Sequence, residues 1–126
     1  MNNNQDDNAH QTIAINRQVL NRQVMVDLIG DDQEMMRKFE IQFLQQAKIS
    51  IAKIAELFKK NELKPIKEEV HFLKTSARAV GAEQSADLLQ SLEEVALKQD
   101  KAQCKEHIIL INRAVKQVYG VITNEK

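Results

Sequence analysis

Residues 63–80 read LKPIKEEVHFLKTSARAV, and this stretch has the most regular apolar pattern in the chain. Its apolar side chains recur at alternating intervals of three and four residues, as in an amphipathic helix with one buried face. They are Leu63, Ile66, Val70, Leu73, Ala77 and Val80. Asn61 is a candidate cap before this helix, Pro65 is tolerated in its first turn, and Gly81 marks its end. The sequence therefore predicts a helix between Asn61 and Gly81.

The residues before this helix predict two more. A short helix is expected through residues 19–28, stopped by Gly30. Asp31 and Glu34 then form an Asp-x-x-Glu start signal, a variant of the capping box, for a long helix that reaches Phe58. The expected core positions of the long helix are Met36, Phe39, Phe43, Ala47, Ile54 and Phe58.

The residues after Gly81 predict the last two helices. One runs from Glu83 to about Lys98, and Asp100 can cap the other, which continues past Val118. Their expected core positions are Ala86, Leu89, Leu92 and Ala96 in the first helix, and Cys104, Ile108, Ile111, Val115, Val118 and Ile122 in the second.

These elements predict an all-α fold. Connections of two to five residues make sequential helices antiparallel, which gives an up-down-up-down four-helix bundle with a short extra N-terminal helix. Strand signals are absent, and only three Gly and one Pro interrupt the chain. Residues 1–12 are expected to be a disordered polar tail, and residues 13–126 a single domain.

The composition excludes several classes of function. Lys plus Arg and Asp plus Glu each total 18, and aromatic residues are only 4%, so neither a basic field nor a stacking platform for nucleic acid is present. No apolar run approaches the ~20 residues needed to span a bilayer, and the N-terminus lacks the order of a signal peptide. The lone Cys104 excludes an internal disulfide and suits a reducing compartment. We expect a cytoplasmic monomer with no membrane or nucleic-acid partner.

Residues 63–80 also contain the side chains that could take part in a reaction. A rotation of 100° per residue puts His71, Lys74, Thr75 and Arg78 on one strip, away from the centre of the apolar face. An outward imidazole titrates near neutrality, and its neutral ring nitrogen is a good nucleophile. Nearby cations can balance charge on an arriving phosphoryl group. The alternative without a function is that His71 is a solvated surface histidine beside ordinary surface charges.

At this point the chain resembles the histidine-phosphotransfer (HPt) domains of two-component phosphorelays. Their motif runs roughly His-x-Leu-Lys-Gly-Ser, a small-residue stretch, Gly-Ala, and then a helix that ends in Leu-Glu. The chain supplies His71, Leu73, Lys74, Ser76, Gly81, Ala82, Leu92 and Glu93 at matching spacing. Residues 28–32, Leu-Ile-Gly-Asp-Asp, are similar to the family's Gly-Asp entry into its long helix, and the resemblance covers about residues 19–122.

The resemblance implies a function. His71 would accept a phosphoryl group, on the ring nitrogen farther from the backbone, from a receiver-domain phosphoaspartate and pass it to another receiver. Lys74 would assist the phosphoryl oxygens, and Glu93 would orient the imidazole or remain a plain surface carboxylate. The partners implied are receiver domains of hybrid histidine kinases and response regulators. Such a module is a phosphocarrier without its own ATP site, cofactor or metal.

Three residues near His71 are candidate partner contacts. Phe72 lies off the apolar face and either docks a partner or covers the edge of the bundle. Arg78 is a weaker candidate on the same strip. Thr75 departs from the motif, because the family has Gly there, and its stiff β-branched side chain narrows the docking gap without closing it.

Other functions have less support in the sequence. A receiver-docking bundle without phosphotransfer, and a structural helical adaptor, are the alternatives that stay open. Cys104 and His107 share a helix face, but Cys104 is a core position and no second pair completes a zinc site. The chain also has no Gly-rich phosphate loop and is too short for a kinase with its own nucleotide domain.

Overall fold

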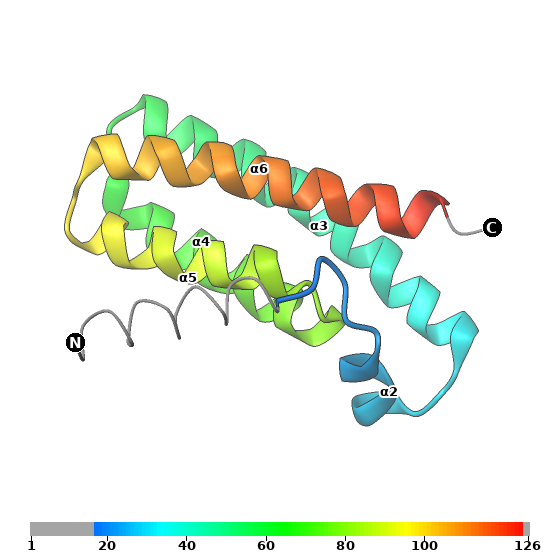
Figure 1. Ribbon diagram of the computed structural model, residues 1–126. Helices are drawn as coiled ribbons and strands as arrows, with labels where there is room; N and C mark the ends of the chain where they lie inside the picture. Colours follow the sequence, from blue (N-terminus) through cyan, green and yellow to red (C-terminus); the bar gives the residue numbers. More distant parts are fainter. Residues whose placement is uncertain (1–16, 125–126) are drawn as a thin grey trace, which may run out of the picture.

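The computed structural model describes residues 17–124, which form five helices and no strands. Figure 1 shows how these helices are arranged. The expected all-α fold is confirmed for this part of the chain. The predicted tail of residues 1–12 lies outside the described residues, as do residues 13–16 and 125–126. The helices are α2 (Gln23–Ile29), α3 (Gln33–Lys59), α4 (Leu63–Val80), α5 (Glu83–Leu97) and α6 (Lys101–Asn124).

The four long helices lie side by side around one core (Figure 1). Helix α3 packs against α4 and α6, and α5 packs against the same two helices, so each long helix has two long neighbours. The loop from α3 to α4 and the loop from α5 to α6 lie at the same end of the molecule, at the left of Figure 1. Short α2 contacts α4. No helix within residues 17–124 is long and apolar enough to cross a membrane.

The core agrees closely with the apolar pattern of the sequence. All six predicted positions of α4 and all four of α5 are buried. In α6, Ile108 and Val115 are half-buried against the core, and the other four predicted positions are buried, including Cys104 with no exposed surface. Burial of one face of each helix against its neighbours supplies the main stabilisation of such a bundle.

Helix α3 departs from the predicted core. Phe39 is 40% exposed, whereas the next residue, Glu40, is buried. The apolar pattern is misleading here because Arg22 compensates the Glu40 charge: its Nε and Nη2 donate to the Glu40 carboxylate at 2.7 and 3.2 Å. Ser50 is also buried and donates to Glu69 of α4 at 2.8 Å. A satisfied polar side chain can occupy a core position that composition alone would assign to an apolar one.

Three predictions about where helices begin were wrong. Helix α3 begins one residue later than predicted, because Asp32, not Asp31, accepts from the backbone N–H of Met35 at 3.0 Å. Asn61 does not cap α4: its φ of 60° puts it in the left-handed region after α3, and the residue before α4 makes no side-chain cap. Residues 19–22 precede α2 instead of forming its first turn.

Other ends are as predicted. Gly30 ends α2, and Asp100 accepts from the backbone N–H of Gln103 at 3.1 Å at the start of α6. Gly81 ends α4 with a φ of 85°. The backbone N–H of Asn21 donates to the Gly81 carbonyl at 2.7 Å, so the segment before α2 is fastened to the turn between α4 and α5. This attachment holds the N-terminal part against the end of the bundle.

Candidate functional site

His71 lies in the middle of α4, and its side chain is 63% exposed. The predicted outward orientation is confirmed. The helix places it there because positions 70, 73 and 77 take the buried arc, which leaves position 71 about 100° away from position 70. Thr75 and Arg78, the residues expected on the same strip, are exposed as well.

Lys74 differs from the expectation of a solvated cation. It is only 5% exposed, and its ammonium donates to Oε1 of Gln90 and to Oε1 of Glu93, both at 2.7 Å. The position lies at the edge of the buried arc, where the aliphatic stem covers apolar surface and the ammonium reaches two acceptors on α5. The prediction that Lys74 belongs to the exposed strip was therefore wrong.

Glu93 of α5 joins His71 and Lys74 into one cluster. Its Oε2 lies 3.7 Å from Nδ1 of His71, and its Oε1 accepts from Lys74. Burial favours the neutral acid, but the hydrogen bond and charge of Lys74, aided by His71, outweigh burial and lower the pKa of Glu93. A carboxylate thus faces the inner ring nitrogen, as expected from the resemblance.

Gln90 is a member of this cluster that the sequence reasoning missed. It precedes Glu93 by three residues on α5 and therefore shares its face. Its amide oxygen accepts from Lys74, and its amide nitrogen donates to Glu94 at 2.9 Å. The i, i+3 spacing to Glu93 was the available signal. The ammonium of Lys74 is held between two side chains on one face of α5.

Comparison with known families decides what this cluster belongs to. The family model described as Hpt domain matches residues 41–119, which is more than half of the chain and includes all of α4 and α5. The chain belongs to the Hpt domain family. Hpt domains carry out histidine phosphotransfer in two-component phosphorelays, where they interact with receiver domains of kinases and response regulators. They are phosphocarrier modules and not enzymes. No significant match to a curated protein or to a solved structure was found.

The remaining candidates, Phe72, Thr75 and Arg78, are exposed on α4 of this Hpt domain. Phe72 is 54% exposed, so about half of its surface is open to a partner. The hydroxyl of Thr75 donates to the His71 carbonyl at 3.0 Å, which directs it back along the helix. Arg78 lies seven residues from His71, roughly 10 Å along the axis, and lines a hollow with Glu83 and Asp87. The structure therefore brings Arg78 to the α5 start and not to the imidazole.

The cluster of His71, Lys74, Gln90 and Glu93 contains the groups needed to carry a covalently bound group on the imidazole. Within residues 17–124, no group of three or more His, Cys, Asp or Glu side chains is arranged to hold a metal ion. His71 supplies a nucleophilic ring nitrogen in contact with solvent, and Glu93 and Lys74 supply fixed charges of opposite sign beside it. Such an arrangement can take up and release a group on the imidazole.

Proposed function

We propose that His71 is the phosphoacceptor of this Hpt domain, charged by a receiver-domain phosphoaspartate and discharged to a second receiver. The observation that carries the proposal is the exposed imidazole with its inner nitrogen 3.7 Å from the Glu93 carboxylate. An imidazole in that position can be approached from solvent by a partner, while a fixed anion lies on its inner side.

The proposed step is an attack by the outer nitrogen, Nε2, on phosphorus. Its lone pair forms the N–P bond, the bond between phosphorus and the aspartate oxygen breaks, and that electron pair remains on the aspartate carboxylate. The ring keeps its Nδ1 proton and gains positive charge as the N–P bond forms. Glu93 faces Nδ1, so its negative charge stabilises the ring during the attack. The same charge favours the tautomer that leaves Nε2 unprotonated.

Lys74 is proposed to have two roles in this step, one toward Glu93 and one toward the phosphoryl group. Two of its three N–H donors are used by Gln90 and Glu93, and these contacts fix the carboxylate beside the ring. The third donor is proposed to bind a phosphoryl oxygen as the group arrives, one helical turn from His71. Lys74 is thus a positioning residue for Glu93 as well as the cation that assists the phosphoryl group.

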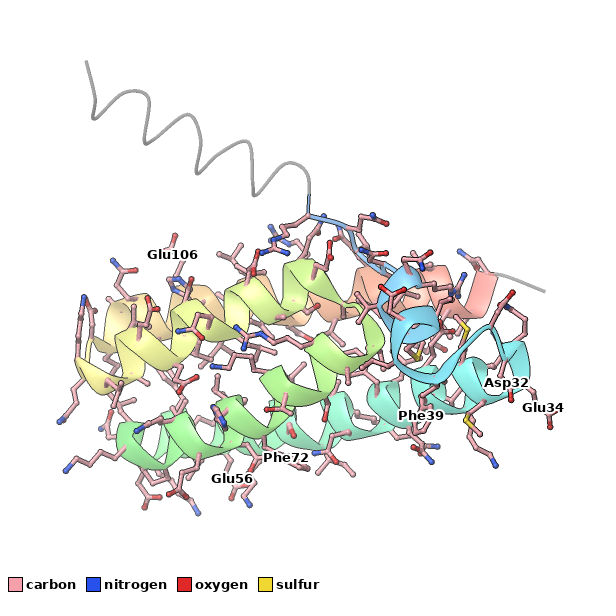
Figure 2. The ribbon with its side chains drawn as sticks, turned by 90° about the horizontal axis from the view of Figure 1, so that it is seen from below. Asp32, Glu34, Phe39, Glu56, Phe72 and Glu106 are labelled. Atoms are coloured by element: carbon pink, nitrogen blue, oxygen red, sulfur yellow. The ribbon has the colours of Figure 1, made fainter. Side chains whose placement is uncertain are left out.

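The receiver is proposed to dock over the exposed side of α4 and the neighbouring part of α3. Phe72 and Phe39, both labelled in Figure 2, are exposed on these two helices, and Ile49 of α3 is exposed as well. Apolar side chains exposed beside a reactive group are typical of a docking surface. Thr75 would lie under the partner, and Arg78 would contact its edge.

The proposal also includes the directions of the helices and the oligomeric state. The four long helices are taken to run up-down-up-down, which is supported by the short connections and by the packing of α3 against α6. The His71 cluster is complete within a single chain, so the proposed phosphotransfer needs no second copy. The chain is proposed to act as a cytoplasmic monomer with receivers as its partners.

One alternative function has a specific observation in its favour. Thr75 occupies the family's usual Gly position directly beside His71, and it is exposed. A side chain there can hold a partner's backbone too far from the imidazole for in-line attack. The domain would then dock receivers without accepting phosphate. A structural adaptor with no receiver affinity is the remaining alternative.

The test uses the full chain with a panel of receiver domains phosphorylated on aspartate with labelled phosphate. We expect the wild-type chain to take up label that is lost in acid, as a phosphohistidine is, and His71→Gln to take up none. His107→Gln is the matched control, because His107 is half-buried on α6 and bonded to the Gln103 carbonyl. Label retained on His71→Gln would refute the proposal. Binding without label would favour the docking alternative, and neither binding nor label would favour the adaptor.

A further inference from the structure

A second feature of the molecule lies between α3 and α6, on helices that do not carry the His71 cluster. These two helices pack less closely than the other neighbouring pairs of long helices. They leave an open groove with a volume of about 460 Å³, which we call the α3–α6 groove. Its apolar floor consists of Leu44, Ile51 and Ala52 of α3 and Val115 and Tyr119 of α6.

The groove remains accessible in the folded chain. Leu44, Ile51 and Val115 are only half-buried, and Tyr119 is 58% exposed. Apolar floor of this kind, open to water along two helices, is an energetic cost that a partner would remove by covering it. The groove extends from Leu44 to Ala52 along α3, which is about 12 Å, or a little more than two helical turns.

The two charged residues that line the groove are both lysines. Lys48 of α3 and Lys116 of α6 line it, and no carboxylate is among its described lining residues. Both lysines are exposed, and Gln45 and Asn112 add neutral polar groups. An apolar floor between two ammonium groups is complementary to an apolar stripe flanked by carboxylates. Two copies of this chain facing each other here would instead bring lysines toward lysines.

We propose that the α3–α6 groove binds an acidic amphipathic helix of a partner protein. The partner would place its apolar face on the floor, over about two turns, and its flanking Asp or Glu side chains against Lys48 and Lys116. Because α4 and α5 carry His71 and Glu93, a helix bound here leaves the imidazole uncovered. The chain can then hold this partner and a receiver at the same time. This proposal does not depend on phosphotransfer by His71.

The probe is a fluorescein-labelled synthetic peptide of sixteen residues with leucines along one helical face and glutamates beside them. A matched peptide carries lysines in place of the glutamates. With the full chain at low salt, we expect fluorescence anisotropy to show roughly tenfold tighter binding of the glutamate peptide. His71→Gln should bind it equally well, which separates this proposal from the proposed function.

A charge exchange tests the location of binding. Lys48→Glu combined with Lys116→Glu changes two exposed side chains, so the fold should be retained, as circular dichroism would check. The exchanged protein should prefer the lysine peptide. Lys64→Glu combined with Lys67→Glu, on the exposed side of α4, is the control and should keep the original preference.

Three results would overturn the proposal. They are equal binding of the two peptides, an unchanged preference in the exchanged protein, and self-association that the peptide reverses. Self-association would identify a second copy as the occupant of the groove.

Discussion

The ammonium of Lys74 lies 2.7 Å from the Glu93 carboxylate and joins α4 to α5 beneath the exposed imidazole of His71. Only 7% of the Lys74 side chain and 14% of the Glu93 side chain is exposed. A pair this far from water is weakly screened, and removal of one partner leaves the other charge nearly buried. The pair therefore links the stability of the bundle to the surroundings of the proposed phosphoacceptor.

Replacement of Lys74 by Met should destabilise the protein by roughly 1–3 kcal/mol, because the Glu93 carboxylate loses its main partner. Urea unfolding at neutral pH measures the change. Lys67→Met, at an exposed position of the same helix, should change stability by less than about 0.5 kcal/mol. Adding Glu93→Met to Lys74→Met should recover part of the loss. If the double variant is less stable than the single one, the ion pair is not the cause.

Stability should fall with acid in a way that depends on Glu93. The folded-state pKa of Glu93 lies below the ordinary value of 4.5, so its contribution is present above that value and is lost as the pH falls through the folded-state pKa. Free energies of unfolding measured from pH 6 to pH 3 should decrease less steeply for Glu93→Gln than for wild type. Glu83, whose pKa is lowered by the Gln18 backbone N–H against the effect of burial, contributes in the same range. Equal slopes for wild type and Glu93→Gln would contradict the prediction.

Alanine substitutions at the three glycines should give three different results. A Cβ on Gly81 would lie 2.0 Å from the Asn21 carbonyl oxygen, and φ is +85°, so Gly81→Ala should cost more than about 2 kcal/mol. Gly30 has φ of +82° but open space around it, so Gly30→Ala should cost about 1 kcal/mol. Gly120 lies within α6 in open space, and Gly120→Ala should stabilise by up to about 1 kcal/mol. Thermal unfolding ranks them, and equal losses at Gly81 and Gly30 would refute the close approach of Asn21.

The pair of Arg22 and Glu40 should hold the N-terminal part of the structure to α3. Glu40 is buried, so Arg22→Met should destabilise by about 2–4 kcal/mol and leave a buried charge. Hydrogen exchange should rise first in α2 and in the amide of Asn21, which is bonded to Gly81. Arg113→Met, an exposed change on α6, is the control. A uniform rise in exchange over all helices would indicate global destabilisation and not release of this segment.

Thr75→Gly should speed phosphotransfer from a receiver, if His71 is the acceptor, since it opens the space beside the imidazole. The helix itself should lose about 1 kcal/mol of stability, because Gly is unfavourable inside a helix. Ala79→Gly, one turn further along the exposed side of α4, has the same helical cost without the change beside His71. Initial rates of label transfer compare the two variants. Equal rates would show that Thr75 does not limit the approach of the partner.

The apolar repeat predicts the helices well where a helix buries one face. Every predicted core position of α4 and α5 is buried, because each of these helices turns a single arc toward the core. In α3 the same reasoning assigned Phe39 to the core, although Glu40 occupies that place. The exchange depends on Arg22, which is 18 residues away in the chain and whose position only the folded structure supplies. A charge that is compensated from a distance is not visible in a local pattern.

In the site, too, some features follow from the local sequence and others depend on residues far away in the chain. The outward orientation of His71 follows from helix geometry alone, and the resemblance correctly implied a carboxylate beside it. The burial of Lys74 did not follow, because its acceptors are 16 and 19 residues away on α5. The α3–α6 groove was also beyond the sequence, since it depends on how closely two helices approach each other and not on which residues they carry.

The burial of Cys104 has a consequence for how the protein responds to oxidants. Removal from water, with a smaller contribution from Asp100, raises the pKa of this thiol, so the reactive thiolate is scarce at neutral pH. Peroxide and alkylating reagents should therefore leave Cys104 of the native protein unmodified. Since the chain has no other cysteine, a cysteine introduced on the surface would be the single site for a fluorophore or spin label, and the wild-type thiol would not need to be replaced first.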